Sequence, residues 1–170
     1  MPRTRIVLIS IGTEDRHDDG AGLAVVAELR RNGIDADLLA LCDGESTRLP
    51  ELWEGADLAV VVDTMHSHPG QAGRVHRVRV RSAGSGTVRA EGSAADSHSS
   101  GLGHAVSLAT VIDRLPGELL IITVEGEDFT VGQGLSPAVA AAVPQTVSMV
   151  RKAVAAHRLA APLDVGDPIS

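Results

Sequence analysis

Residues 5–33 read RIVLISIGTEDRHDDGAGLAVVAELRRNG, and this stretch decides the fold class. Residues 5–11 are a short run of β-branched and other apolar side chains that ends at Gly12, which is the pattern of a buried strand. After a polar loop, apolar side chains recur at helical spacing over residues 23–30, and Gly33 provides a stop. A strand that leads through a loop into a helix is the repeating unit of a parallel α/β sheet.

The rest of the chain continues this alternation. Further strands are predicted at residues 36–42, 57–63, 73–82 and 118–126, and further helices at residues 49–55, 101–115 and 136–159. The strand at 73–82 interleaves valines with charged side chains, which is typical of an edge strand with one solvated face. Pro144 is expected to kink or split the last helix. Residues 83–100 are rich in Gly, Ser and Ala without apolar periodicity, so we expect a functional or mobile loop there.

We therefore predict an α/β fold with three layers, in which helices cover both faces of a mostly parallel sheet. A chain of 170 residues is most simply one domain, predicted here over residues 1–159. Residues 160–170 are expected to form a disordered tail.

Composition excludes several classes of protein. The net charge is −7, and the basic residues do not gather into the stripe that tracks a phosphate backbone, so nucleic acid is not an expected partner. Cys42 is the only cysteine, which excludes intramolecular disulfides and suits a reducing cytoplasm. No apolar stretch approaches the ~20 residues that span a bilayer, and the N-terminus has no signal-peptide pattern, so a membrane association is not expected.

Three polar segments are candidates for chemistry. Ligands of open α/β sheets bind beyond the carboxyl ends of the strands. This rule selects GTEDRHDDG (residues 12–20), DTMHSHPG (residues 63–70) and DSHSSG (residues 96–101). Each segment carries a carboxylate and a histidine, which are the oxygen and imidazole donors that suit a divalent ion such as nickel or zinc. Taken singly, each has an ordinary explanation, because an Asp caps helices and turns and a loop histidine is usually only solvated.

Other readings of these segments are weaker. The first segment lacks the GxGxxG spacing and the Lys of a phosphate-binding loop, and its acids would repel phosphate. His66 and His68 form a second possible metal set with Asp63, although such a turn is also an ordinary solvated loop. There is no GxSxG elbow, and Cys42 lies at the end of a predicted strand, where a cysteine is more often inert packing than a nucleophile.

Four landmarks, in order from about residue 6 to residue 150, resemble the hydrogenase maturation proteases. The family pattern of Gly-x-Gly-Asn followed by Asp-Asp/Glu-Gly-x-Gly is similar to SIGTEDRHDDGAG, and its strand ending in Asp before a Pro-Gly turn is similar to LAVVVDTMHSHPGQAG. Its Ser-His before a helix is similar to DSHSSGL, and its final Gly-x-x-Leu-Ser is similar to VEGEDFTVGQGLSPAV.

The resemblance implies a metal-dependent endopeptidase that removes the C-terminal extension of a [NiFe]-hydrogenase large-subunit precursor after nickel insertion. Its metal ligands, which are also the catalytic residues, fall on Asp19, Asp63 and His98. The implied metal is nickel, which can arrive with the substrate, and zinc or cadmium could substitute. The implied fold is a phosphorylase/hydrolase-like αβα sandwich of five strands, with residues 73–82 as the one antiparallel strand, and the implied location is the cytoplasm.

The chain departs from the family pattern in places that bear on substrate and turnover. Ser10 occupies the position of the family's first Gly, and Thr13 occupies the position of its Asn. The family's Asp-Gly-Gly-Thr stretch corresponds to DGEST in this chain. Asp18 and Glu14 are the nearest candidates for a general base. The alternative function is a non-catalytic metal-sensing or hydrogenase-assembly protein with the same fold. A nucleotide-binding domain is a third reading, which the acidic first loop disfavours.

Overall fold

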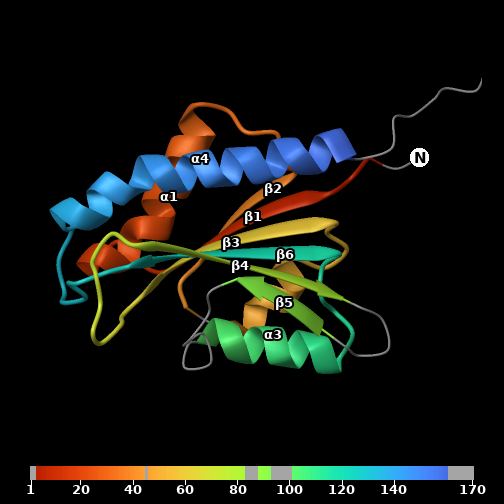
Figure 1. Cartoon of the computed structure of the whole chain (residues 1–170), viewed down its shortest axis with the longest axis horizontal. Coiled ribbons are helices and arrows are strands. Elements are labelled where there is room, and N and C mark those ends of the chain that lie inside the picture. Colours follow the sequence, from red (N-terminus) through yellow and green to blue (C-terminus); the bar gives the residue numbers. More distant parts are fainter. Residues whose placement is uncertain (1–2, 45, 83–87, 93–100, 161–170) are drawn as a thin grey trace, which may run out of the picture.

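The computed structural model describes residues 3–44, 46–82, 88–92 and 101–160, and within these it contains one mixed sheet covered by helices (Figure 1). The six strands are β1 (Ile6–Ile11), β2 (Leu38–Cys42), β3 (Leu58–Met65), β4 (Val75–Ser82), β5 (Val88–Gly92) and β6 (Glu118–Glu125). The helices are α1 (Ala21–Arg31), α2 (Leu49–Leu52), α3 (Gly101–Val111) and α4 (Pro137–Ala160), with short 3₁₀ helices η1 (His17–Gly20) and η2 (Ser46–Arg48). The predicted tail lies outside the described residues.

The sheet has the order β2-β1-β3-β6-β4-β5. The first four strands in this order are parallel, and β4 runs antiparallel to both β6 and β5. The predicted fold class, with β4 as the antiparallel strand, is therefore confirmed. The sheet has six strands rather than five, because Val88–Gly92 pairs with β4 inside the segment that the sequence predicted to be a loop. The rest of that segment, residues 83–87 and 93–100, lies outside the described part of the chain.

Helices α1 and α4 pack on one face of the sheet, and α2 and α3 cover the other (Figure 1). Successive strand residues point to opposite faces, so the central strands supply both cores. The α1/α4 core contains Ile6, Leu8, Val25, Leu29, Val60, Val62, Leu120, Ile122, Val150 and Val154. The α2/α3 core contains Val7, Ile9, Trp53, Ala59, Val61, Ala105, Ala109, Leu119 and Ile121. Trp53, fully buried, donates its indole N–H to the Arg114 carbonyl oxygen at 2.9 Å.

Helix α4 is continuous, so of the predicted kink or split at Pro144 the split is wrong, and the kink stays a prediction. Proline removes the hydrogen bond to the carbonyl four residues earlier. Pro144 and Ala140 are both exposed, so that carbonyl oxygen lies on the solvent side of the helix. None of the helices in the described residues is both long enough and apolar enough to cross a membrane.

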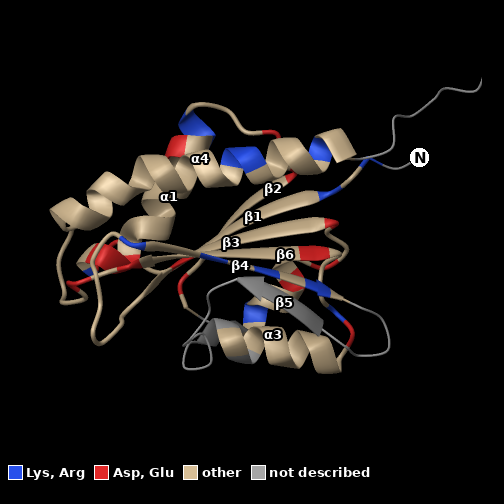
Figure 2. Cartoon of the chain, viewed as in Figure 1, with Lys and Arg blue, Asp and Glu red and all other residues tan. Residues whose placement is uncertain are grey.

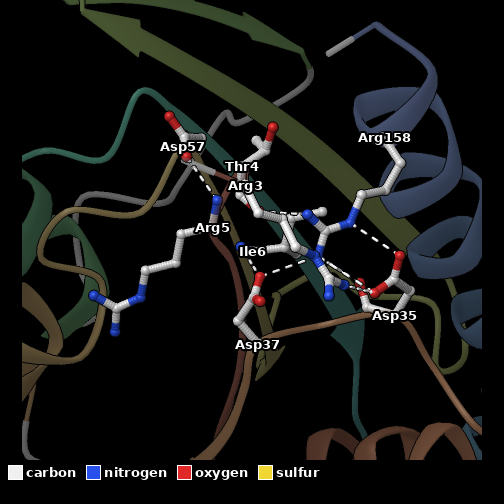
Figure 3. Close-up of polar contacts among 8 residues, drawn as sticks. All are labelled: Arg3, Thr4, Arg5, Ile6, Asp35, Asp37, Asp57 and Arg158. Carbon is white, nitrogen blue, oxygen red and sulfur yellow. Dashed lines mark hydrogen bonds and ion pairs between the residues drawn. The ribbon is translucent and has the colours of Figure 1, made fainter. Parts of the chain in front are cut away.

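The C-terminal turn of α4 is tied to the amino ends of β1 and β2 (Figure 3). The Arg158 guanidinium donates to the Thr4 carbonyl oxygen, to the Asp35 carbonyl oxygen at 3.2 Å and to Asp37 Oδ2 at 3.0 Å. Asp37 Oδ2 also accepts the Ile6 N–H at 2.7 Å. Burial would raise the pKa of Asp37, but the Ile6 N–H and Arg158 outweigh it and hold that pKa below its usual value. This contact fixes the edge of the sheet opposite the candidate site.

Candidate active site

Two of the three predicted ligands, Asp19 and Asp63, come together at the carboxyl edge of the sheet. Asp63 lies within β3, which continues to Met65, so the predicted end of that strand at Asp63 is two residues short. Ala59 and Val61 belong to the α2/α3 core, and strand alternation places Asp63 on the same face. Asp19 lies in η1, between β1 and α1, where Figure 2 shows acidic residues in red.

A threonine joins the two carboxylates. Asp63 Oδ1 accepts the Thr64 backbone N–H at 2.7 Å, and the Thr64 hydroxyl lies 3.4 Å from Asp19 Oδ1. The other oxygen of Asp19 accepts the Thr13 backbone N–H at 3.0 Å. The residue that replaces the family's Asn therefore still supplies a backbone donor that orients Asp19.

The environment of Asp63 disfavours its charged form. Burial raises its pKa to about 7, the Thr64 N–H partly opposes this rise, and the nearby Asp19 carboxylate adds to it. No basic side chain of the described residues contributes to that shift. A bound cation would stabilise two neighbouring carboxylates whose negative charge is little balanced by positive charge. The donor set therefore fits a divalent metal ion.

The third predicted ligand, His98, lies outside the described residues. In the described part of the chain, no group of three or more His, Cys, Asp or Glu side chains is arranged to hold a metal. The first described residue after His98 in the sequence is Gly101, where α3 begins. Helix α3 leads into β6, whose first residue is at the amino edge, so the N-terminus of α3 lies toward the carboxyl edge that carries Asp63.

Glycines make room for the turn that carries Asp19. Gly12 has φ +127°, and a Cβ there would lie 2.0 Å from the Asp19 carbonyl oxygen. A side chain at this position would therefore displace η1. Ser10, which stands where the family has its first Gly, is fully buried, and its hydroxyl has no hydrogen-bond partner among the described residues.

Asp18 is a structural residue and is not available as a base. It is completely buried, and its carboxylate accepts the backbone N–H groups of Glu127, Asp128 and Ser136 at 2.9, 3.0 and 2.7 Å, together with the Ser136 hydroxyl at 2.9 Å. Burial would raise its pKa, but these four donors outweigh burial and lower it. Glu14, the other candidate base, is exposed.

The loop between β6 and α4 is bonded along its length to the turn before α1. The His17 backbone N–H donates to the Gly132 carbonyl oxygen, and the Gly132 N–H donates to the Asp15 carbonyl oxygen. His17 Nδ1 lies 2.9 Å from the Gly134 carbonyl oxygen. Gly132, with φ +151°, packs against the imidazole so closely that a Cβ would lie 2.2 Å from His17 Nε2. We call residues 13–19 and 127–136 the two-loop clamp. Gly132, Gly134 and Ser136 of the VGQGLS stretch therefore have a structural role, because they contact His17 and Asp18. These contacts fix the turn that carries Asp19.

His66 and His68 do not form a metal cluster with the described residues. Their rings pack against each other with centroids 4.4 Å apart, and His66 also contacts Phe129. Cys42 is buried, as predicted for a packing residue.

A buried glutamate paired with a half-buried histidine was missed by the sequence reasoning. His76 Nε2 lies 3.3 Å from Glu125 Oε1, on the face of the sheet that also carries Asp63. Burial would raise the pKa of Glu125, but hydrogen bonds from the Gln71 N–H, Ser67 and His76 lower it. The alternation of the strand could have predicted the position of His76, because it lies two residues before Val78 and four before Val80, which face the core.

Comparison with solved structures gives the same fold over almost the whole chain. The hydrogenase maturating endopeptidase HybD from Escherichia coli superposes with a TM-score of 0.70 at 21% sequence identity, covering 91% of this chain and 94% of that one. The [NiFe] hydrogenase maturation protease HybD from Thermococcus kodakarensis gives 0.63 at 22% identity, covering 89% and 99%. HycI from the same archaeon gives 0.60 at 19% identity, covering 90% and 94%. No protein-family model and no curated protein matches the sequence. The chain thus has the fold of the hydrogenase maturation proteases.

Proposed function

We propose that this chain is a metal-dependent endopeptidase of the cytoplasm that removes the C-terminal extension of a [NiFe]-hydrogenase large-subunit precursor after nickel insertion. The observation that carries the proposal is the meeting of Asp19 and Asp63 at the carboxyl edge of this fold. The Asp63 carboxyl group is buried there, and no basic side chain of the described residues compensates its charge. The names of the similar structures support the reaction class and the kind of partner.

In this proposal Asp19, Asp63 and His98 bind the metal, and the nickel is part of the substrate. A divalent cation held there would polarise the scissile carbonyl and lower the pKa of a bound water. The Thr13 N–H and the Thr64 hydroxyl hold Asp19, and the Thr64 N–H holds Asp63, so these bonds orient the two carboxylates that would hold the cation. Three protein ligands would leave coordination positions for water and substrate.

The second candidate, a metal-sensing or assembly protein without turnover, is favoured by one observation. Of the two acids proposed as bases, Asp18 is fully engaged by four donors and Glu14 is exposed beside a groove. A site without a positioned base could bind a nickel-loaded precursor without cleaving it.

Replacement of His98 by Ala tests the ligand set. We expect cleavage of the nickel-loaded precursor to fall at least ~100-fold, because a displacement of ~1 Å is enough for such a loss. Its sequence surroundings are polar, so the free energy of unfolding should change by no more than ~0.5 kcal/mol. The matched control is the His66→Ala/His68→Ala double variant, which should retain activity. Normal cleavage by His98→Ala, or loss only in the double variant, contradicts the assignment.

The same incubation separates the two functions. A shortened large subunit supports the endopeptidase, whereas a stable complex without a shortened product supports the assembly protein. Nickel-free precursor is the control for metal-dependent recognition.

A further inference from the structure

An apolar groove opens beside the turn that carries Asp19. It lies between α1, the end of β2 and the loop before α4, and its volume is about 350 Å³. Its lining includes Leu23, Ala24, Ala27, Leu41 and Leu135. This volume is at the lower end of the ~300–1,000 Å³ range of ligand pockets, so it suits one or two side chains better than a whole cofactor.

The groove leaves apolar surface uncovered where packing could have buried it. Leu41 is 53% exposed although it lies in a strand, and Ala27 is exposed in the middle of α1. Small residues create the space: Gly134 lines the groove, and a Cβ added there would meet nothing within 4 Å. The lining also includes the polar residues Glu14, His17 and Arg30. Apolar surface accompanied by polar residues is the usual composition of a protein-binding patch.

The groove lies beside the turn that carries one acid of the candidate site. Gly20, which lines it, directly follows Asp19 in the chain, and the two-loop clamp supplies the lining residues Glu14, His17 and Leu135. The clamp therefore shapes both the turn with Asp19 and one wall of the groove. A polypeptide held for cleavage at Asp19 and Asp63 must leave the site on both sides of the scissile bond.

Strand β2 offers a matching backbone edge. It is the outermost strand beside β1, and its other edge pairs with no strand of the described residues. An extended peptide can add to such an edge through main-chain hydrogen bonds, with alternate side chains entering pockets. Leu41, one residue before the end of β2, belongs to both the strand and the groove.

We propose that the groove binds an apolar side chain of the precursor polypeptide, held in an extended conformation along β2 near the bond to be cut. The inference rests on the proposed function for its partner. The groove thus determines specificity by the apolar character and position of one precursor residue.

The test is a direct binding measurement with the full chain and the nickel-loaded large-subunit precursor of a [NiFe]-hydrogenase from the same organism. Ala27→Trp fills the groove from an exposed helical position, and Ala155→Trp, exposed on α4, is its matched control. Leu41→Ser removes the apolar floor, and Leu159→Ser, at an 87% exposed position, is the second control. Loss of one buried apolar side chain is expected to weaken binding about tenfold or more. The two control variants should bind like the wild type.

Binding and cleavage are read separately, so the groove and the proposed function can fail independently. Binding without cleavage by the wild-type chain refutes the endopeptidase, and the groove is still tested by the affinities of the variants. Wild-type affinity in both Ala27→Trp and Leu41→Ser overturns the groove, as does an equal loss in the controls. Absence of any binding by the wild-type chain overturns both. Replacement of successive apolar precursor residues by Asp should identify one position whose effect disappears in Ala27→Trp.

Discussion

Replacing Asp63 by Asn should make the metal-free protein more stable at alkaline pH. Asn keeps an oxygen to accept the Thr64 N–H, and its amide group can donate toward Asp19. The substitution also removes a carboxyl group whose pKa is raised from 3.8 to about 7 by burial and by Asp19, with the Thr64 N–H acting against the rise.

The sign and size follow from proton linkage. Between pH 4 and pH 7 the folded state binds the Asp63 proton more tightly than the unfolded state, so the stability of the wild-type protein falls as the pH rises through this window. The loss is complete above about pH 7. At ~1.4 kcal/mol for each pH unit of difference, it amounts to at most about 4 kcal/mol. The gain from Asp63→Asn should therefore be about 2–4 kcal/mol at pH 8 and shrink toward zero near pH 4.

Urea unfolding in the presence of a chelator, at pH 4.5 and pH 8, measures this difference. Asp57→Asn is the matched control, because the Asp57 carboxylate accepts the Arg5 N–H at 2.7 Å at the opposite edge, and this variant should lose stability. Added Ni²⁺ should stabilise the wild-type protein and have little effect on Asp63→Asn. An Asp63→Asn protein that is less stable at both pH values would refute the view that this carboxyl group is buried at a cost.

Three further substitutions test other parts of the structure by the free energy of unfolding. Asp18→Asn should cost about 2–4 kcal/mol, because one of the two acceptor oxygens becomes a donor facing an N–H group, and faster hydrogen exchange of residues 127–136 should accompany the loss. Ser10→Ala should be neutral or stabilising by ~1 kcal/mol, since it removes a buried hydroxyl that has no partner among the described residues. A clear destabilisation would show that this hydroxyl has a partner. Arg158→Met should cost about 1–2 kcal/mol and more than Arg151→Met, whose guanidinium makes one hydrogen bond to backbone. Equal effects would contradict the view that Arg158 ties the end of α4 to the sheet.

The elements that the sequence predicts well are those whose apolar spacing is strong. Strands β1, β3 and β6 are almost uninterrupted apolar runs, and the rule for strand ends is enough to bring Asp19 and Asp63 to one place. The fold class follows from the alternation of such strands with helices.

The parts that the sequence does not predict depend on partners far away in the chain or on backbone pairing. Strand β5 is held by its ladder to β4, and its residues VRAEG carry little apolar pattern. Asp18 reads as one more acid at a helix start, and only the donors that follow it by 109 to 118 residues show that it is a structural acceptor. Pro144 is tolerated because it lies on the solvent side of α4. Which side faces solvent depends on how α4 packs.

The two-loop clamp has a consequence for the order of events during synthesis. The turn with Asp18 and Asp19 is made early. The donors that bind the Asp18 carboxylate, and one wall of the groove, come from residues 127–136. Ribosomes add about 5–20 residues each second, so several seconds separate the two halves. A nascent chain shorter than this has its first acidic turn but lacks the donors that bind the Asp18 carboxylate. Competence for metal and substrate would then be acquired in one late step, when most of the polypeptide has been made, and incomplete chains would not compete for precursor.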